Sequence, residues 1–148
     1  MDFHSFGAKS RAKLDNCHPA LTEIAELALR ISPYDFTIIH GYRDEELQNA
    51  LYNSGASTKQ YPDSRHNKTD DPTYLHTEYF SDAIDFGPWI DGDVPWDDTH
   101  IFALIAGCFI AAAAHYGLTL RWGGDWDSDG STTDQKLMDW GHVELVHV

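Results

Sequence analysis

The chain has 148 residues, with 24 Asp and Glu against 10 Lys and Arg, so its formal net charge is −14. This length fits a single domain, residues 1–148, around one hydrophobic core. The charge argues against a nucleic-acid partner, because phosphate contacts require clustered Lys and Arg, which the sequence does not show.

The two cysteines, Cys17 and Cys108, are too few and too far apart for a disulfide framework, and neither is a good nucleophile candidate. The N-terminus lacks the basic and then apolar pattern of a signal peptide, and the apolar run 101–114 is too short to cross a bilayer. We therefore expect no secretion signal and no stable membrane insertion.

The first half of the chain predicts a helix over 19–31, a strand over 36–42, a second helix over 43–52 and a long loop over 56–80. The helices follow from apolar residues at helical spacing, the strand from a short β-branched run, and the loop from polar composition with two prolines. Arg43 is therefore expected at a strand-to-helix junction.

The second half predicts a strand over 81–86, a turn-rich connection over 88–98, a helix over 99–116, a strand over 118–122, an Asp- and Gly-rich loop, a short segment over 135–138 and a final strand over 141–146. The apolar helix over 99–116 is expected to be the main core element. Because the elements show no regular βαβ repetition, we expect an α+β fold with a small, mainly antiparallel sheet and packed helices.

The final strand carries polar residues in an otherwise apolar run. Asp139 precedes His142 by three residues, and His142 and Glu144 alternate with apolar residues, so both are expected on one face. One interpretation is a metal site. The alternative is a solvated edge strand that ends the fold.

Asp85 strengthens the metal interpretation, because it stands between apolar residues in a predicted strand. Burying a carboxylate without a partner costs several kcal/mol, on the order of the penalty for any unpaired buried charge. A zinc ion held by Asp85, His66 and His142 offsets that cost and leaves one position open for water. The chain lacks the cysteines of a closed structural zinc site.

A second acidic pattern runs through Asp125, Asp127 and Asp129, followed by Gly130. Alternating carboxylates and a glycine are typical of a calcium loop, although its twelfth position is Lys136 where a full EF-hand has Glu. Possible calcium binding and an acidic solvated turn both remain open.

Several motifs together resemble the zinc D-alanyl-D-alanine carboxypeptidase (VanY-like) family, and most closely the phage endolysins that act as L-alanyl-D-glutamate endopeptidases. The similar segments are residues 32–38, 41–43, 64–66, 82–86, 121–126 and 141–145. Among them, Ser64-Arg65-His66 matches the Ser-x-His motif, and the final motif has an acidic residue three positions before His142. The resemblance implies the hedgehog and D-Ala-D-Ala peptidase-like fold.

The resemblance also assigns roles to residues. It implies that the zinc ligands are His66, Asp85 and His142, that Asp139 is the general base, and that Arg43 steadies the scissile carbonyl. Glu144 then either orients a ligand imidazole or is a plain surface carboxylate. Trp140 is a weak candidate for substrate contact, against ordinary packing.

The chain departs from the family pattern by an insertion-like loop over 67–80, between His66 and Asp85. The insertion raises His76 as a competing ligand, although His76 does not match the motif and His66 does. A loop of this length can still bring its ends together, because closure entropy grows slowly with length. The segment is either a substrate-facing flap or a surface excursion.

We therefore expect a zinc metallopeptidase that cleaves the L-alanyl-D-glutamate bond of peptidoglycan stem peptides as a phage endolysin. The alternatives are a D-alanyl-D-alanine carboxypeptidase and a non-catalytic zinc-containing module that binds the cell wall. We also expect a monomer without a separate wall-binding domain. It would accumulate in the host cytoplasm and reach the wall after another protein has permeabilised the membrane.

Overall fold

The computed structural model describes residues 4–67, 81–131 and 139–146. In chain order its elements are α1 (Ala8–Leu14), α2 (Pro19–Ile31), β1 (Phe36–His40), α3 (Glu45–Asn53), β2 (Ala83–Pro88), α4 (Thr99–His115), β3 (Leu120–Trp122) and β4 (His142–Leu145). The predicted segment 135–138, most of the insertion-like loop and both His76 and Lys136 lie outside the described residues.

The four strands form one sheet in the order β1-β2-β4-β3, and each neighbouring pair is antiparallel. This confirms the expected α+β class with a small antiparallel sheet. The alternative of a solvated edge strand for the chain's last strand is wrong, because β4 lies between β2 and β3. The polar side chains His142 and Glu144 of this interior strand are buried, so they need partners inside the molecule.

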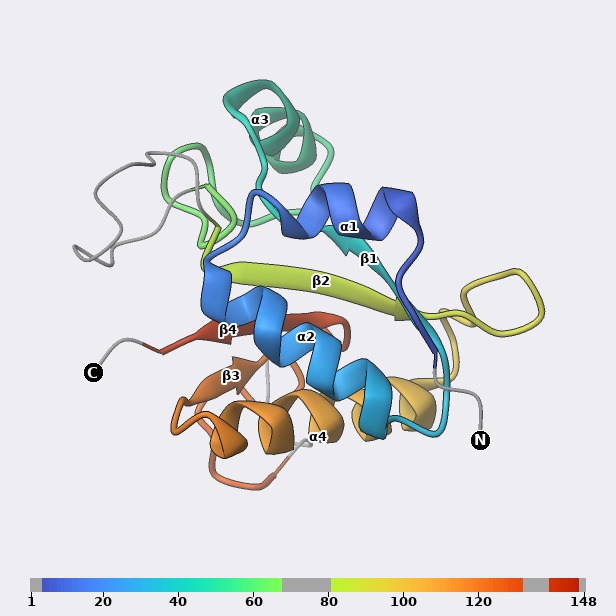
Figure 1. Ribbon diagram of the computed structural model, residues 1–148. Coiled ribbons are helices and arrows are strands. Elements are labelled where there is room, and N and C mark those ends of the chain that lie inside the picture. The colour runs from blue at the N-terminus through green and yellow to red at the C-terminus, as the bar shows by residue number, and fades with distance from the viewer. Residues whose placement is uncertain (1–3, 68–80, 132–138, 147–148) are drawn as a thin grey trace.

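Helices α2 and α4 lie side by side and cover one face of the sheet (Figure 1). Apolar residues at alternate strand positions face them: Ile84, Phe86 and Val143 are completely buried. The Phe86 ring stacks on Phe109 of α4 with centroids 5.0 Å apart. As expected, α4 supplies many of the core residues. The intervening strand positions are left for the opposite face, where the polar residues lie.

Helix α1 was not predicted, because its sequence has too few apolar residues to show a helical period. It forms against β1, where the Ser10 hydroxyl lies 3.0 Å from the Thr37 hydroxyl and accepts from the Ile38 amide at 3.1 Å. Gly41 allows the close approach that follows, since a Cβ there would stand 2.5 Å from the Lys13 carbonyl oxygen. Tertiary contacts therefore stabilise this helix more than its own sequence does.

Helix α3 begins at Glu45, two residues after the predicted start. Asp44 is its N-cap, and the Asp44 carboxylate accepts from the Leu47 amide at 2.8 Å. The cap leaves Arg43 outside the helix, between β1 and α3, so the expected strand-to-helix junction is confirmed. The Arg43 side chain is thereby free to turn towards the sheet.

Cys17 and Cys108 are both free thiols, as expected. Burial raises the pKa of the Cys17 thiol to about 12, and burial also raises the pKa of Cys108. Neither sulfur is therefore a reactive thiolate near neutral pH. Among the described residues, no helix combines the length and the apolar character that a bilayer span requires.

Candidate metal centre and active site

The site begins with the register of the sheet. Asp85 of β2 stands directly opposite His142 of β4, and on its other side it pairs with His40 of β1. These three side chains therefore form a row across three neighbouring strands. They occupy the face that alternates with the buried Ile84 and Phe86, away from α2 and α4.

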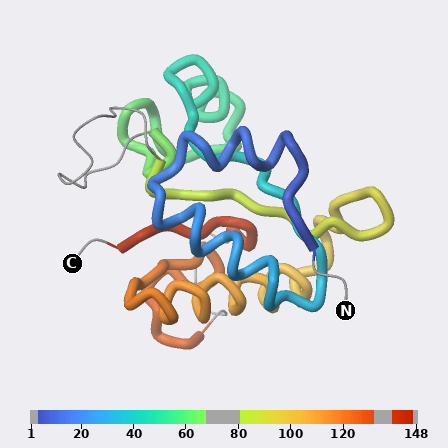
Figure 2. Tube along the Cα trace, viewed as in Figure 1, coloured from blue at the N-terminus to red at the C-terminus, as the bar shows by residue number. Residues whose placement is uncertain are grey.

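His66 reaches this row from the loop after α3. The Arg43 amide donates to the His66 carbonyl at 2.8 Å, and the Asp82 amide donates to the Arg65 carbonyl at 3.0 Å. The Asn67 side chain adds a bond from its amide nitrogen to the Arg43 carbonyl at 3.0 Å. The loop is thus fixed to the segment before α3 and to the residue before β2, and its green trace lies between α3 and the start of β2 in Figure 2.

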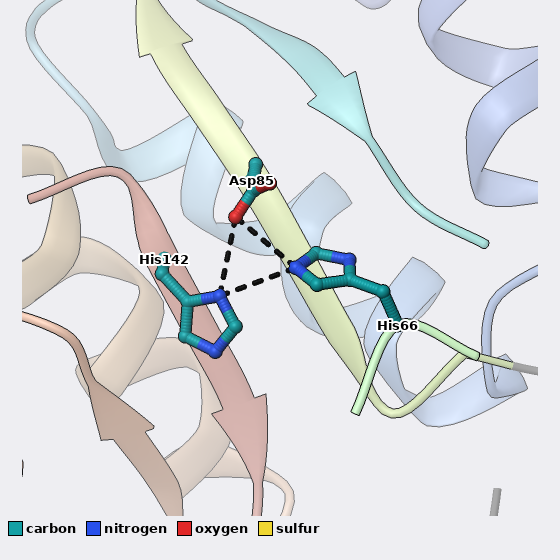
Figure 3. A group of neighbouring side chains, drawn as sticks. All are labelled: His66, Asp85 and His142. Carbon is teal, nitrogen blue, oxygen red and sulfur yellow. Dashed lines mark hydrogen bonds and ion pairs between the residues drawn. The ribbon is translucent and has the colours of Figure 1, made fainter. Parts of the chain in front are cut away.

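His66, Asp85 and His142 form a compact group that we call the metal trio (Figure 3). Asp85 Oδ1 lies 3.2 Å from His66 Nε2 and 3.1 Å from His142 Nδ1, and the two nitrogens are 3.2 Å apart. Ligand atoms around a tetrahedral zinc ion with bonds near 2.05 Å lie about 3.3 Å apart. The donor atoms therefore fit a zinc-sized cation.

The other nitrogen of each imidazole is already engaged. His66 Nδ1 donates to the Gly41 carbonyl at 2.8 Å, and His142 Nε2 donates to Glu144 Oε1 at 2.9 Å. These bonds select the tautomers in which His66 Nε2 and His142 Nδ1 carry the lone pairs. Two lone pairs and a carboxylate oxygen then face one point, which is the arrangement that orients metal ligands.

The protonation states of His66 and Asp85 also suit a metal. Burial lowers the pKa of His66, although Asp85 opposes that shift, so the imidazole is neutral near pH 7. Burial favours the neutral form of Asp85, but the surrounding imidazoles outweigh it and hold the pKa of Asp85 well below its usual range. A neutral imidazole and an ionised carboxylate are the forms that bind metal.

Glu144 contacts the trio through His142 and is buried. Its Oε2 accepts from Arg121 at 3.0 Å and lies 3.5 Å from Arg65 Nε. Burial alone would raise the pKa of Glu144, but the His142 hydrogen bond and Arg121 lower it to about 2. Of the two alternatives for Glu144, the surface carboxylate is therefore wrong, and its contact with His142 is the one expected of an orienting residue.

The two arginines around Glu144 were not among the predicted site residues. Arg121 stands directly opposite Glu144 in the β3–β4 register, and Arg65 also donates to the Leu145 carbonyl at 2.6 Å. Arg65 immediately precedes His66 in the Ser-x-His motif, which is a sequence signal for it. Arg121 begins the similar segment 121–126, but its position opposite Glu144 follows only from the register of β3 against β4 in the folded sheet.

Asp139 lies beside the trio but outside it. Its Oδ2 is 4.0 Å from His142 Nδ1, the nitrogen that faces the metal position, and its side chain is half exposed. Partial burial and the Asp85 charge raise the pKa of Asp139, which brings it closer to that of an effective general base. Gly123 permits this placement, since a Cβ there would stand 2.2 Å from the Asp139 carbonyl oxygen.

Arg43 contacts the trio through Asp85, whose Oδ2 accepts a hydrogen bond from Arg43 Nη2. Arg43 Nη1 donates to the buried Gln48 side chain at 3.3 Å, and His40 Nδ1 lies 3.3 Å from both Arg43 Nη2 and Asp85 Oδ2. Neither Gln48 nor His40 was a predicted site residue. Together they hold the guanidinium beside the ligand carboxylate.

Two hollows meet at Arg43, Ala56 and Asp139. The first, of about 400 Å³, we call the aromatic hollow; its apolar lining is Ile39, Leu51, Phe86, Trp96, Phe102 and Trp140. The second, of about 610 Å³, we call the cationic hollow, and it contains the two trio imidazoles and the cations Lys59, Arg65 and Arg121. Trp140 thus reaches the cleft, as the weak substrate-contact prediction requires.

Asp125, Asp127 and Asp129 also converge and form what we call the acidic turn. The two oxygens of Asp125 accept from the Asp129 amide at 3.3 Å and the Gly130 amide at 2.9 Å. Asp129 Oδ1 accepts from the Ser131 amide at 2.8 Å. Asp127 and Asp129 are exposed. Convergence and exposure fit both alternatives, so calcium binding stays a prediction.

An open three-ligand metal site with a carboxylate and an arginine beside it, set in a cleft, is the arrangement of metal-dependent hydrolases. The comparisons with known proteins agree with this class. Residues 1–146 match the family model described as phage L-alanyl-D-glutamate peptidase. The chain belongs to this family of phage peptidases, so the expected family and enzyme class are confirmed.

Two relatives illustrate the similarity. The L-alanyl-D-glutamate peptidase of Escherichia phage T5 is 36% identical over 146 residues, which are 95% of this chain and 97% of that protein. The crystal structure of the Serratia marcescens L-Ala D-Glu endopeptidase ChiX matches with a TM-score of 0.72 and 28% identity, over 95% of this chain and 89% of that one. The expected peptidase fold is therefore confirmed as well.

Proposed function

We propose that this protein is a zinc peptidase that hydrolyses the L-alanyl-D-glutamate bond in the stem peptides of bacterial peptidoglycan. Membership of the phage peptidase family and the two named relatives support the reaction. The observation that carries the proposal is the metal trio with Asp139 Oδ2 at 4.0 Å from His142 Nδ1, in a cleft open to solvent.

The trio would hold zinc through His66 Nε2, Asp85 Oδ1 and His142 Nδ1. Two imidazole nitrogens and one carboxylate oxygen suit zinc better than magnesium or calcium, which prefer oxygen ligands only. When bound, zinc supplies Lewis acidity, which lowers the pKa of a coordinated water and polarises a carbonyl. Calcium at the acidic turn remains a separate prediction, because its support is limited to three converging carboxylates.

The residues of the chain then perform the proton transfers and the positioning. Asp139 takes the proton of the attacking water and delivers it to the amine of D-glutamate as the peptide bond breaks. Arg43, held by Gln48 and Asp85, donates to the carbonyl oxygen on which negative charge develops. Glu144 keeps the His142 imidazole oriented throughout.

Two alternatives use the same site. A D-alanyl-D-alanine carboxypeptidase would share the zinc chemistry and differ only in the residues that contact the substrate. A non-catalytic wall-binding module would need neither a base nor an arginine beside the trio, so Asp139 and Arg43 argue against it. The family match favours the endopeptidase.

The test is mass spectrometry of purified peptidoglycan after digestion with wild type and with Asp139→Ala, each with and without a zinc chelator. New N-terminal D-glutamate, lost with the variant and with chelator, is the expected result. Release of free D-alanine would replace the proposal with the carboxypeptidase. Wall binding without any cleavage would replace it with the binding module.

Because the protein belongs to a phage family, we further propose that it acts in host lysis as a single-domain monomer. It would accumulate in the host cytoplasm and reach the wall after another protein permeabilises the membrane. Light scattering of the purified chain and fractionation of expressing cells before and after permeabilisation test these points. A stable oligomer, or wall cleavage in cells with intact membranes, would contradict them.

A further inference from the structure

The two hollows of the cleft differ in charge more than the composition leads one to expect. The chain has only 10 Lys and Arg in 148 residues, yet Arg43, Lys59, Arg65 and Arg121 all line the cationic hollow. Of these four, only Arg43 also lines the aromatic hollow. In an acidic protein, such a concentration at one end of a catalytic cleft indicates recognition of an anionic group.

The four cations are not equally available to a ligand. Arg43 is engaged by Asp85, and Arg65 by the Leu145 carbonyl and Glu144. Arg121 commits Nη2 to Glu144, but its side chain is 42% exposed and a guanidinium has five N–H donors. The exposed Lys59 ammonium makes no hydrogen bond or ion pair with any residue that the structure describes.

The same hollow also contains carboxylates, which limit its positive potential. Asp139 borders the aromatic hollow as well, and Asp63 is an exposed residue on the rim. Glu144 is neutralised in place by its ion pairs with Arg121 and His142. The cations left for a ligand are therefore Lys59 and the exposed side of Arg121.

The proposed substrate is asymmetric in the same way. A D-glutamyl residue carries two carboxyl groups, and the continuing peptide can use at most one of them. At least one free carboxylate therefore stands close to the scissile bond, on the side of the leaving amine. On the other side, the L-alanyl residue presents only a methyl group near the bond.

We propose that the cationic hollow binds the D-glutamyl side of the substrate, with Lys59 and Arg121 contacting its free carboxylate, and that the aromatic hollow receives the L-alanyl side. This assignment rests on the proposed function and adds the direction of the substrate and its specificity residues. Asp139 borders both hollows, as a residue that protonates the leaving amine between them must.

The experiment compares two acylated L-alanyl-D-glutamyl peptides that differ only at the free carboxylate, which is left ionised in one and converted to a primary amide in the other. We expect the zinc-loaded wild type to favour the carboxylate peptide about tenfold in kcat/KM, the factor that one charge-assisted hydrogen bond provides. Lys59→Gln should reduce this preference roughly threefold through KM, as expected for an exposed ion pair.

Lys9→Gln is the matched control, because Lys9 is an exposed lysine of α1 that lines neither hollow. It removes the same charge and should keep the full preference. Lys59→Glu reverses the charge and should shift the preference towards the amide peptide. The double variant Lys59→Gln/Arg121→Gln should discriminate least, with zinc content measured to show that the Glu144 contact to His142 still holds the site.

The ratio of kcat/KM for the carboxylate peptide to that for the amide peptide decides whether the assignment holds. Equal preference in wild type, Lys59→Gln and Lys59→Glu, with both peptides cleaved, overturns the assignment and leaves the proposed peptidase function standing. A folded, zinc-loaded wild type that cleaves neither peptide overturns the proposed function and the assignment together. Because Lys59 is exposed, its variants are expected to fold even if the double variant does not.

Discussion

The metal trio and the acidic turn are both groups of ligand-type side chains whose atoms converge, yet they are built differently. In the trio, the side chains come from a loop and two strands, and His66 and His142 are buried. In the acidic turn, all three carboxylates come from five consecutive positions and point largely to solvent. Convergence alone therefore does not distinguish a metal site from a solvated turn.

The partners of the ligand atoms make the distinction. In the trio, the imidazole nitrogens that face away from the metal position donate to the Gly41 carbonyl and to Glu144, which leaves the inner nitrogens available. In the acidic turn, Asp125 uses both oxygens for amides of its own turn. Buried ligands with external support are prepared to receive a cation, whereas Asp125 is already engaged by the backbone of its own turn.

The largest expected effect comes from matched substitutions in the two groups. Asp85→Asn removes the only carboxylate of the trio. It should abolish zinc binding and lower the rate of cleavage about a thousandfold or more. Asp127→Asn makes the same chemical change in the acidic turn and should keep its zinc and lose at most a few-fold in activity. Zinc content by elemental analysis and peptidoglycan cleavage measure both. Loss of zinc in Asp127→Asn would remove the distinction.

Asp139→Asn should give the next largest effect, a fall in kcat of about 10² to 10⁴. The amide has the shape of the carboxylate but cannot accept the proton, and Asp139 is not one of the trio. Zinc content should therefore stay at the wild-type level while kcat falls. A variant that loses its zinc would instead make Asp139 a ligand.

Glu144 tests the support of the trio. Glu144→Ala removes the bond to His142 Nε2 and should weaken zinc binding by roughly 10- to 100-fold. Glu144→Gln keeps an acceptor oxygen but loses the charge, so its zinc affinity should fall between those of Glu144→Ala and wild type. Competition with a chromogenic chelator measures the affinities. Wild-type zinc affinity in Glu144→Ala would show that the Glu144 contact does not orient the His142 imidazole for zinc binding.

The metal-free protein should show a smaller, pH-dependent effect. Burial disfavours the charged form of His142, but hydrogen bonds to Asp85 and Glu144 outweigh it and raise the pKa of His142 to about 9. A raised folded-state pKa stabilises the fold fully below the ordinary value of 6.5, and this contribution is lost as pH rises through about 9. The Tm of the chelated protein should therefore fall over this range.

The zinc-loaded protein is the control for that measurement, because the metal takes the place of the proton on His142 Nδ1. Its Tm should not show the decrease that loss of the His142 proton causes as pH rises. Parallel curves for the chelated and zinc-loaded forms between pH 6.5 and 9 would contradict the role given to this proton.

The smallest expected effect concerns calcium. If the acidic turn binds calcium, chelating calcium at constant zinc should lower activity a few-fold, because the turn lies a short way before Asp139 and His142 in the chain. Asp127→Asn should abolish that response. Unchanged activity on chelation would leave the acidic turn as a solvated turn.

Much of the fold was predictable from the sequence because the local patterns are strong. Apolar residues at helical spacing indicated α2, a long apolar run indicated α4, short β-branched or alternating runs indicated strands, and the polar residues of β4 indicated a site. Helix α1 was missed because contacts with β1 stabilise it, and the start of α3 was misplaced because the Asp44 cap was overlooked. Each of these misses concerns a short-range pattern that is weak on its own.

The sequence by itself determined the residue types, the alternation that separates polar from apolar faces, and the motifs that nominated His66, Asp85 and His142. The tertiary structure decided which residues meet. Alternation states which face a residue occupies but not which residue stands opposite it, and that depends on strand register. The pairing of Asp85 with His142 and of Arg121 with Glu144 therefore exists only in the folded sheet, and the metal trio, its support and the cationic hollow all follow from it.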